Sequence, residues 1–177
     1  MADAGNMTVT KETILEIIAA FSDPDIGKRH AAVAALREIG EPAVAPLIAA
    51  IATAPDNDRR WYAAIALSRI GEPAILPLIM AMETTPDREF RKYAAAALGE
   101  IGEPAADTLI DGMGSGDPEL RGFLSQALCR IGKPAVAHLT RRLQDPDETI
   151  RQCATLTLWQ MGETGLPDMI GEVREGD

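Results

Sequence analysis

Aspartate–arginine pairs recur at regular intervals along the chain, with the arginine four residues after the aspartate each time. The pairs are Asp25 and Arg29, Asp56 and Arg60, Asp87 and Arg91, Asp117 and Arg121, and Asp147 and Arg151. A carboxylate beside a guanidinium could serve as a catalytic acid–base group or as an anion site. A catalytic or anion-binding site is expected to occur once in a chain, whereas this pair occurs in every repeat. We therefore predict a structural role, with the two side chains bonding bidentately within one helix and reaching the adjacent layer.

A ten-residue motif has the same periodicity as the pairs. It reads IGEPAVAPLI at 39–48, IGEPAILPLI at 70–79, IGEPAADTLI at 101–110, IGKPAVAHLT at 131–140 and MGETGLPDMI at 161–170. Its glycines stand at 40, 71, 102, 132 and 162, which gives periods of 31, 31, 30 and 30 residues. Periods of this size are typical of stacked helical pairs.

Each repeat is predicted to contain two helices. The aspartate caps the first helix, which the motif glycine ends in a left-handed conformation, and the following Glu-Pro turn starts the second. Apolar residues with helical spacing predict the core face of the first helix, and in the second repeat they are Ala63, Ala66, Leu67 and Ile70. The second helices of the first two repeats should bury Val44, Leu47, Ile48 and Ile51, then Ile75, Leu78, Ile79 and Met82.

This pattern predicts one solenoid over 10–177, preceded by a flexible N-terminus at 1–9. A lone capping helix is expected at 10–21. The repeats are expected at about 22–54, 55–85, 86–115, 116–144 and 145–177. Gly165 and Pro167 in the last motif, with the acidic tail, fit a degenerate C-terminal cap.

The pattern D-x-x-x-R, followed by A-A-x-A-L-x-x-I-G-x-P-A-x-x-x-L-I, resembles the HEAT-like repeats named for phycobilisome lyases. The resemblance covers about residues 22–171, although the fourth loop, GSGDPE, is one residue shorter and places its proline after the aspartate. It implies an all-α, right-handed α-α superhelix in which second helices line the concave surface and first helices the convex one. It also implies that the aspartates and arginines cross-link neighbouring layers.

Composition narrows the function classes. The net charge of −10 and an aromatic content of 4% argue against nucleic-acid binding, although five basic residues and no acidic ones lie between 120 and 144. No basic segment followed by an apolar run stands at the start, and the most apolar run is too short for a membrane span, so we expect a cytoplasmic protein. Cys129 and Cys153 lack the spacing of a disulfide framework or a metal site.

Function is expected where the repeats differ, and one candidate surface lies on the second helices. Six, nine and ten residues after the glycine, the side chains should face away from the core and form a concave groove that grades from apolar to basic. Its candidate protein-binding residues are Ala49, Met80, Asp111, His138, Arg141 and Arg142. Alternatives stay open: the alanines serve helix propensity, Arg141 pairs with Asp111 across layers, and His138 is a solvated surface residue.

A second candidate surface lies on the first helices. Trp61 and Ile65 form an i, i+4 pair on the predicted convex face, and Leu156 and Trp159 occupy the same face in the last repeat. Exposed tryptophans favour an interface, including self-association. The alternative is that Trp61 lies flat on its neighbours and that Trp159 packs under the C-terminal tail.

We therefore predict a non-enzymatic protein-binding scaffold without cofactor or metal. The alternative is an accessory subunit of an enzyme, by analogy with phycobilin lyases, which carry similar repeats and work as partnered chains. His30 and His138 lie in different repeats without a nucleophile nearby, and the His-Glu pairs of iron-dependent HEAT-repeat hydroxylases are missing from the sequence. Binding to an unidentified protein or peptide is favoured, and nucleic acid and membrane are disfavoured as partners.

Overall fold

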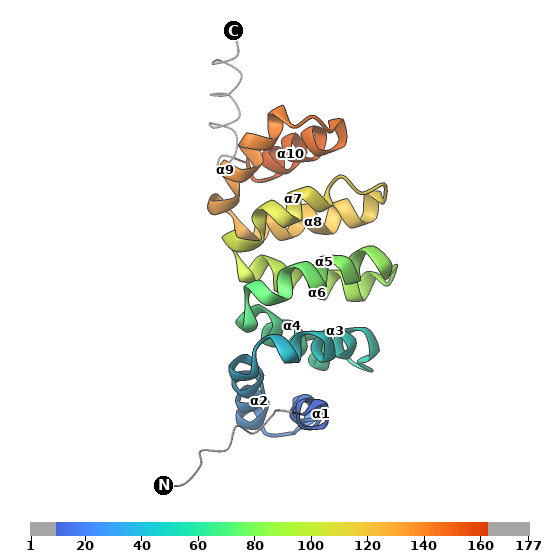
Figure 1. The fold of residues 1–177 in the computed structure, drawn as a ribbon, viewed down its shortest axis with the longest axis vertical. Coiled ribbons are helices and arrows are strands. Elements are labelled where there is room, and N and C mark those ends of the chain that lie inside the picture. Colours follow the sequence, from blue (N-terminus) through green and yellow to red (C-terminus); the bar gives the residue numbers. More distant parts are fainter. Residues whose placement is uncertain (1–9, 163–177) are drawn as a thin grey trace.

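The computed structural model describes residues 10–162, and this part of the chain is an all-α stack, as predicted (Figure 1). The ten α-helices of the described part are α1 Lys11–Ala19, α2 Ile26–Ile39, α3 Val44–Thr53, α4 Asn57–Ile70, α5 Ile75–Thr84, α6 Arg88–Ile101, α7 Ala106–Gly112, α8 Pro118–Ile131, α9 Lys133–Arg141 and α10 Glu148–Gln160. No strand occurs between residues 10 and 162.

The helices form two parallel rows. The first helices α2, α4, α6 and α8 pack on one another in one row, and the second helices α3, α5, α7 and α9 follow one another in the other. Helix α1 packs on α2 and α3, in the place of a second helix without its own first helix. The predicted flexible N-terminus at 1–9 and the degenerate cap around Gly165 and Pro167 lie outside the described residues. The handedness and curvature of the superhelix stay predictions.

An aspartate caps each first helix, as the sequence predicts. The side chain of Asp87, for example, accepts hydrogen bonds from the N–H groups of Glu89 at 2.9 Å and Phe90 at 3.4 Å. Equivalent bonds are made by the other four repeat aspartates: Asp25, Asp56, Asp117 and Asp147. The caps satisfy N–H groups that have no partner within the helix and fix where each first helix begins.

The repeat arginines bond backbone carbonyls, and the predicted bidentate pairing within one helix is wrong. Arg60 Nε donates to the carbonyl of Ile51 at 3.3 Å, and Arg91 Nε donates to that of Met82 at 3.0 Å. The other three arginines donate to carbonyls in the loop before their own helix: Arg29, Arg121 and Arg151. In each repeat one oxygen of the aspartate, Oδ1, caps the helix, while the arginine extends back to a carbonyl that precedes the helix.

A cross-link between layers of the kind that the resemblance implies forms at one junction. Arg91, whose side chain is 4% exposed, places Nη1 2.8 Å from Oδ2 of Asp117, the cap of the next first helix. Glu119 lies 3.6 Å from the same nitrogen. Within residues 10–162, this is the only ion pair between a repeat arginine and the cap aspartate of the following layer.

The motif glycines end the first helices with positive φ, as expected, but not in the left-handed helical region. Gly71 has φ 82° and ψ −136°, and the φ values of the others lie between 66° and 88°. This combination mirrors the extended conformation and is accessible essentially to glycine alone. It turns the chain directly into a 3₁₀ turn, such as η3 Glu72–Ala74, which leads into the second helix.

The core lies between the two rows and is built from aliphatic side chains and alanines. Most predicted core residues are buried, including Leu47, Leu67 and Leu78 at 0% exposure, whereas Ile48 and Ile70 are half-buried because they lie at the edge of a layer. Alanines fill the contacts between neighbouring first helices, so their backbones can approach closely. Because these residues form the core, the outward-facing residues of each layer can differ between repeats.

The glycine conformation can be tested with Gly71→Ala. An alanine at φ 82° and ψ −136° would be strained, so we expect the free energy of unfolding in urea to fall by about 1–3 kcal/mol. Gly122→Ala is the matched control. Gly122 lies within α8 with open space at its Cβ position, so the change should stabilise the helix by about 0.5–1 kcal/mol. Equal effects of the two substitutions on the free energy of unfolding would contradict the positive-φ conformation of Gly71.

The cap at Asp117 predicts a dependence of stability on pH. The N–H of Leu120 and the guanidinium of Arg91 hold the pKa of this carboxyl below its usual 3.8. A folded-state pKa below the unfolded value stabilises the fold above about pH 4, and this stabilisation is lost as pH falls through the folded pKa.

The test is Asp117→Asn, which keeps an N-cap acceptor but removes the charge. We expect its free energy of unfolding to fall less than that of the wild type between about pH 5 and pH 2. Urea unfolding at a series of pH values measures this, and parallel profiles for the two chains would refute the linkage.

Candidate functional site

The outward face of the second helices is formed by two positions in each layer, five and nine residues after the glycine. Both are exposed in every layer between residues 40 and 141: Ala45 and Ala49, Leu76 and Met80, Asp107 and Asp111, Ala137 and Arg141. Position nine is exposed as expected. Positions six and ten are half-buried, apart from the exposed Pro77, because they face the boundary between layers. The expectation that these positions face away from the core is therefore corrected.

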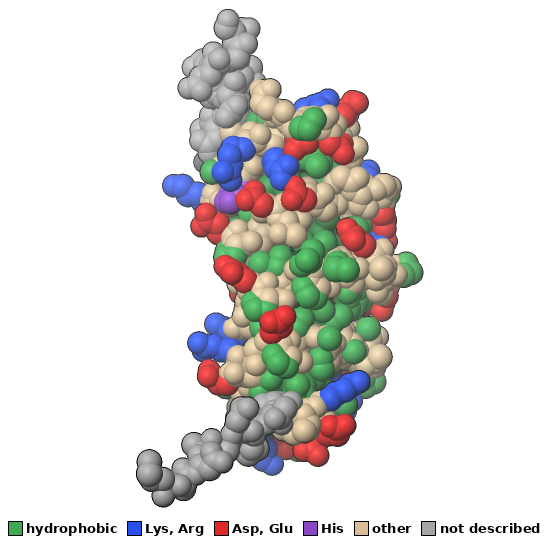
Figure 2. Space-filling view, in the orientation of Figure 1, with side chains coloured by type: hydrophobic (Ala, Val, Ile, Leu, Met, Phe, Trp, Pro, Cys, Tyr) green, Lys and Arg blue, Asp and Glu red, His purple; other side chains and the backbone are tan. Residues whose placement is uncertain are grey.

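The N-terminal half of this face is apolar. Leu15 and Ala19 of α1 stand in the same register, so the exposed row continues onto the capping helix. Exposed fractions are 47% for Leu15, 58% for Leu76 and 55% for Met80. We call the six exposed residues of α1, α3 and α5 the apolar ridge: Leu15, Ala19, Ala45, Ala49, Leu76 and Met80. Figure 2 shows hydrophobic side chains gathered over this part of the face.

A hollow of about 180 Å³ lies beside the apolar ridge, between α1 and α3. Its lining includes Leu15, Ile18 and Ala50, so its walls are largely aliphatic. The hollow gives the ridge a recess in which a partner's side chain could be buried.

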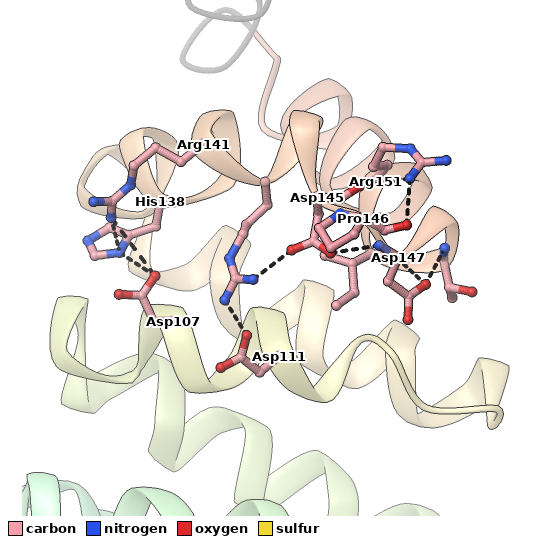
Figure 3. A network of polar contacts seen from close by, with 11 residues as sticks. Asp107, Asp111, His138, Arg141, Asp145, Pro146, Asp147 and Arg151 are labelled. Atoms are coloured by element: carbon pink, nitrogen blue, oxygen red, sulfur yellow. Dashed lines mark hydrogen bonds and ion pairs between the residues drawn. The ribbon is translucent and has the colours of Figure 1, made fainter.

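The C-terminal half of the face carries charges that are already paired (Figure 3). Arg142 donates to Asp111 of the preceding layer and to Asp145 at 2.6 Å. The partner of Asp111 is thus Arg142 and not Arg141, because position ten points across the layer boundary while position nine points outward. The basic end of the predicted gradient is therefore largely neutralised by carboxylates of the same chain.

His138 belongs to the same paired region, and the alternative of a solvated histidine is wrong. Its side chain is 16% exposed, and Nδ1 lies 2.9 Å from Oδ1 of Asp107 and 2.9 Å from Nη2 of Arg141. Nδ1 must carry a proton to donate to Asp107 and must lack it to accept from Arg141, so the two bonds belong to different tautomers of the ring. The hydrogen bond with His138, followed by the attraction of the nearby cations, holds the pKa of Asp107 below its usual range.

On the first-helix face, the structure separates the four predicted residues into two places. Trp61 is 49% exposed, whereas Ile65 is half-buried, and both line a hollow between α4 and α6. Leu156 and Trp159 are 56% and 66% exposed on α10, in the last described layer. Whether Trp159 packs under the C-terminal tail concerns residues outside the described range.

Cys129 and Cys153 are free and half-buried, and burial raises the pKa of each thiol. In the described part of the chain, no group of three or more histidine, cysteine, aspartate or glutamate side chains is placed to hold a metal ion. No described helix combines the length and apolar character needed to cross a membrane.

Comparison with known families agrees with this geometry. The family profile described as HEAT repeats matches residues 44–113 and 106–174, which is most of the chain. The chain belongs to the HEAT-repeat family. A second profile, the PBS lyase HEAT-like repeat, matches residues 28–53 of this HEAT-repeat chain and confirms the resemblance seen in its sequence.

Individual proteins add little to the family assignment. No curated protein matches the HEAT-repeat chain significantly. A solved structure, the cryo-EM structure of a de novo designed 16-helix transmembrane nanopore, aligns at 16% identity with a TM-score of 0.26. The alignment covers 93% of this chain and 54% of the designed chain, so this chain spans about half the length of that protein. At this TM-score the likeness carries no argument.

Sequence reasoning missed Leu76 and Asp107, the position-five residues of their layers. A signal for them exists: each precedes a predicted residue, Met80 or Asp111, by one helical turn, and residues four apart share a helix face. It also missed Tyr93 and Arg69, which line the hollow beside Trp61, because their meeting depends on how α4 and α6 pack.

The two neighbouring arginines should contribute differently to stability. Arg142→Met leaves Asp145, whose side chain is 7% exposed, without its side-chain partner, so we expect a clear loss in the free energy of unfolding. Arg141→Met removes a side chain that is 65% exposed and should change stability by less than about 0.5 kcal/mol. Urea unfolding of both variants measures the difference, and a larger loss for Arg141→Met would show that the pairing is misassigned.

Proposed function

We propose that this HEAT-repeat chain is a non-enzymatic scaffold that binds a partner protein through the apolar ridge. The observation that carries the proposal is the exposure of Leu15, Leu76 and Met80 in one row on a chain with a net charge of −10. Contiguous exposed apolar surface on a charged protein marks an interaction site. Repeat solenoids use such extended faces to hold partners.

The shape of the ridge favours a helix as the bound element. The ridge crosses α1, α3 and α5, and the hollow between α1 and α3 offers one recess for an anchoring side chain. An amphipathic helix presents apolar residues three and four apart, which suits a row of this kind. Met80 adds a flexible contact that adapts to different partner side chains.

Charges beside the ridge favour a partner with basic flanks. Glu41 and Glu72 are exposed one helical turn before Ala45 and Leu76, and neither forms an ion pair within residues 10–162. The arginines at the other end of the face are engaged by Asp107, Asp111 and Asp145. The ligand that suits this face therefore has an apolar side bordered by lysine or arginine.

The experiment compares Met80→Glu with Ala137→Glu. Both place a glutamate at an exposed position of a second helix, but only Met80 belongs to the apolar ridge. We expect Met80→Glu to weaken partner binding by at least about tenfold and Ala137→Glu to weaken it by less than about twofold. Proteins captured from a lysate of the source organism are identified by mass spectrometry, purified and titrated against each chain by calorimetry.

The effect of Met80→Glu on affinity tests whether the partner binds the apolar ridge. A partner whose affinity falls only with Met80→Glu supports the proposal, provided that both variants keep the thermal unfolding midpoint of the wild type. Partners bound equally by the two variants would exclude the ridge as the binding surface.

The accessory-subunit function stays the second candidate, because a PBS lyase HEAT-like repeat matches residues 28–53. It also requires a protein partner, so the capture experiment serves both. The two functions differ in what the captured partner does: an enzyme whose turnover depends on this chain would favour the accessory subunit.

A further inference from the structure

A second hollow lies on the opposite, first-helix face, between α4 and α6. It has a volume of about 330 Å³. Trp61 and Ile65 of α4 line it together with Tyr93 of α6, and the buried Ala64 and Ala97 form its floor. We call this hollow the first-helix groove. A volume of this size matches the lower end of the range for ligand pockets.

Trp61 is held in place although it is exposed. Its ring packs edge-on against the ring of Tyr62, with centroids 4.9 Å apart and planes at 83°. Tyr62 is only 6% exposed, so the indole rests on a fixed support. Trp61 and Tyr93 also line an adjoining hollow of about 350 Å³, so the indole stands between two hollows. An aromatic side chain fixed before binding loses little conformational freedom when a ligand arrives.

The groove belongs to one junction and not to the repeat. The residues equivalent to Trp61 in the other layers are His30, Lys92, Gly122 and Gln152. The position of Gly99 is likewise held by larger residues elsewhere, namely Arg37, Ser68, Cys129 and Trp159. A structural requirement of the stack would recur in each layer, whereas this combination occurs once.

Gly99 explains how an arginine from the next layer reaches the groove. A Cβ at Gly99 would lie 2.7 Å from Cδ and 2.9 Å from Cβ of Arg130, so only glycine lets the Arg130 stem cross α6 here. Oε1 of Glu100 then accepts a hydrogen bond from Nε of Arg130 at 2.8 Å and forms an ion pair with Nη2 at 2.7 Å. The guanidinium is thus fixed at the groove's edge.

The charges that line the groove favour an anion. Three cations, Arg69, Lys92 and Arg130, face one carboxylate, that of Glu100. Arg130 is paired with Glu100, and Lys92 lies 3.4 Å from Glu89 at the surface. Arg69 forms no ion pair with any residue between 10 and 162. On a chain with a net charge of −10, this locally positive patch stands out as a place where an acidic group is attracted.

We propose that the first-helix groove binds an acidic peptide segment of a second protein. An aliphatic or aromatic side chain of the segment lies between Trp61 and Tyr93, and an adjacent aspartate or glutamate pairs with Arg69. This partner has the opposite charge to the one that suits the apolar ridge. Together with the partner proposed for the apolar ridge, on which this last step rests, the groove lets the chain join two different proteins, one on each face of the solenoid.

The test is selection of peptides from a displayed library of random linear sequences, with the full-length wild-type chain as bait. We expect enriched peptides to carry an aspartate or glutamate next to an aromatic or aliphatic residue. Synthetic copies are then titrated by fluorescence against a chain carrying Trp159→Phe, in which Trp61 is the remaining tryptophan and reports binding directly. Affinity should fall as salt rises, because an exposed ion pair is screened.

Matched variants assign the peptides to a face. Arg69→Glu should weaken binding at least about tenfold, whereas Arg37→Glu makes the same charge change on α2, outside the groove, and should weaken it less than about threefold. Met80→Glu should leave the affinity unchanged, which separates this site from the apolar ridge. Basic peptides whose binding is weakened by Met80→Glu belong to the apolar ridge and do not bear on this site. No enrichment of acidic peptides, or equal effects of Arg69→Glu and Arg37→Glu, would each overturn the proposal. Because Arg69 is exposed, its substitution leaves the fold intact, and this is checked by thermal unfolding.

Discussion

The hydrogen bond from each repeat arginine to a carbonyl just before its own helix is the contact on which the stack depends. It ties the start of a first helix to the loop or to the second helix that precedes it, while the cap aspartate satisfies the N–H groups of the same helix start. Together the two side chains set where each layer begins. Because the same joint occurs at every repeat, the layers can stack on a continuous core of alanines and aliphatic residues.

Because repeated residues form the joints and the core, the outward-facing residues can differ from layer to layer. On the second-helix face they differ between its two halves. Its N-terminal half carries the apolar ridge, and its C-terminal half carries a set of ion pairs between α7, α9 and the following loop. The paired half adds polar contacts between layers, so the two halves of one geometric face have different physical roles.

The first-helix face shows the same principle at one junction. Small side chains let α4 and α6 approach closely, and Gly99 admits the Arg130 stem across α6. The result is a recess with aromatic walls and a cationic edge, built from residues of three helices. The hollow therefore depends on the small residues of α4 and α6 as much as on the aromatic and cationic side chains that surround it.

The sequence by itself determined the helices, the aspartate caps, the glycine turns and most of the core, because each depends on residues within one or two helical turns of one another. Leu76 and Asp107 were also within reach of the helical period. Only the tertiary structure decided that Arg142 bonds Asp111, that the repeat arginines bond carbonyls, and that Arg130 reaches Glu100 over Gly99. These contacts join residues of different layers or loops, and their partners depend on how far and at what angle neighbouring helices pack. The periodicity of the sequence does not specify the distance or the angle between neighbouring helices.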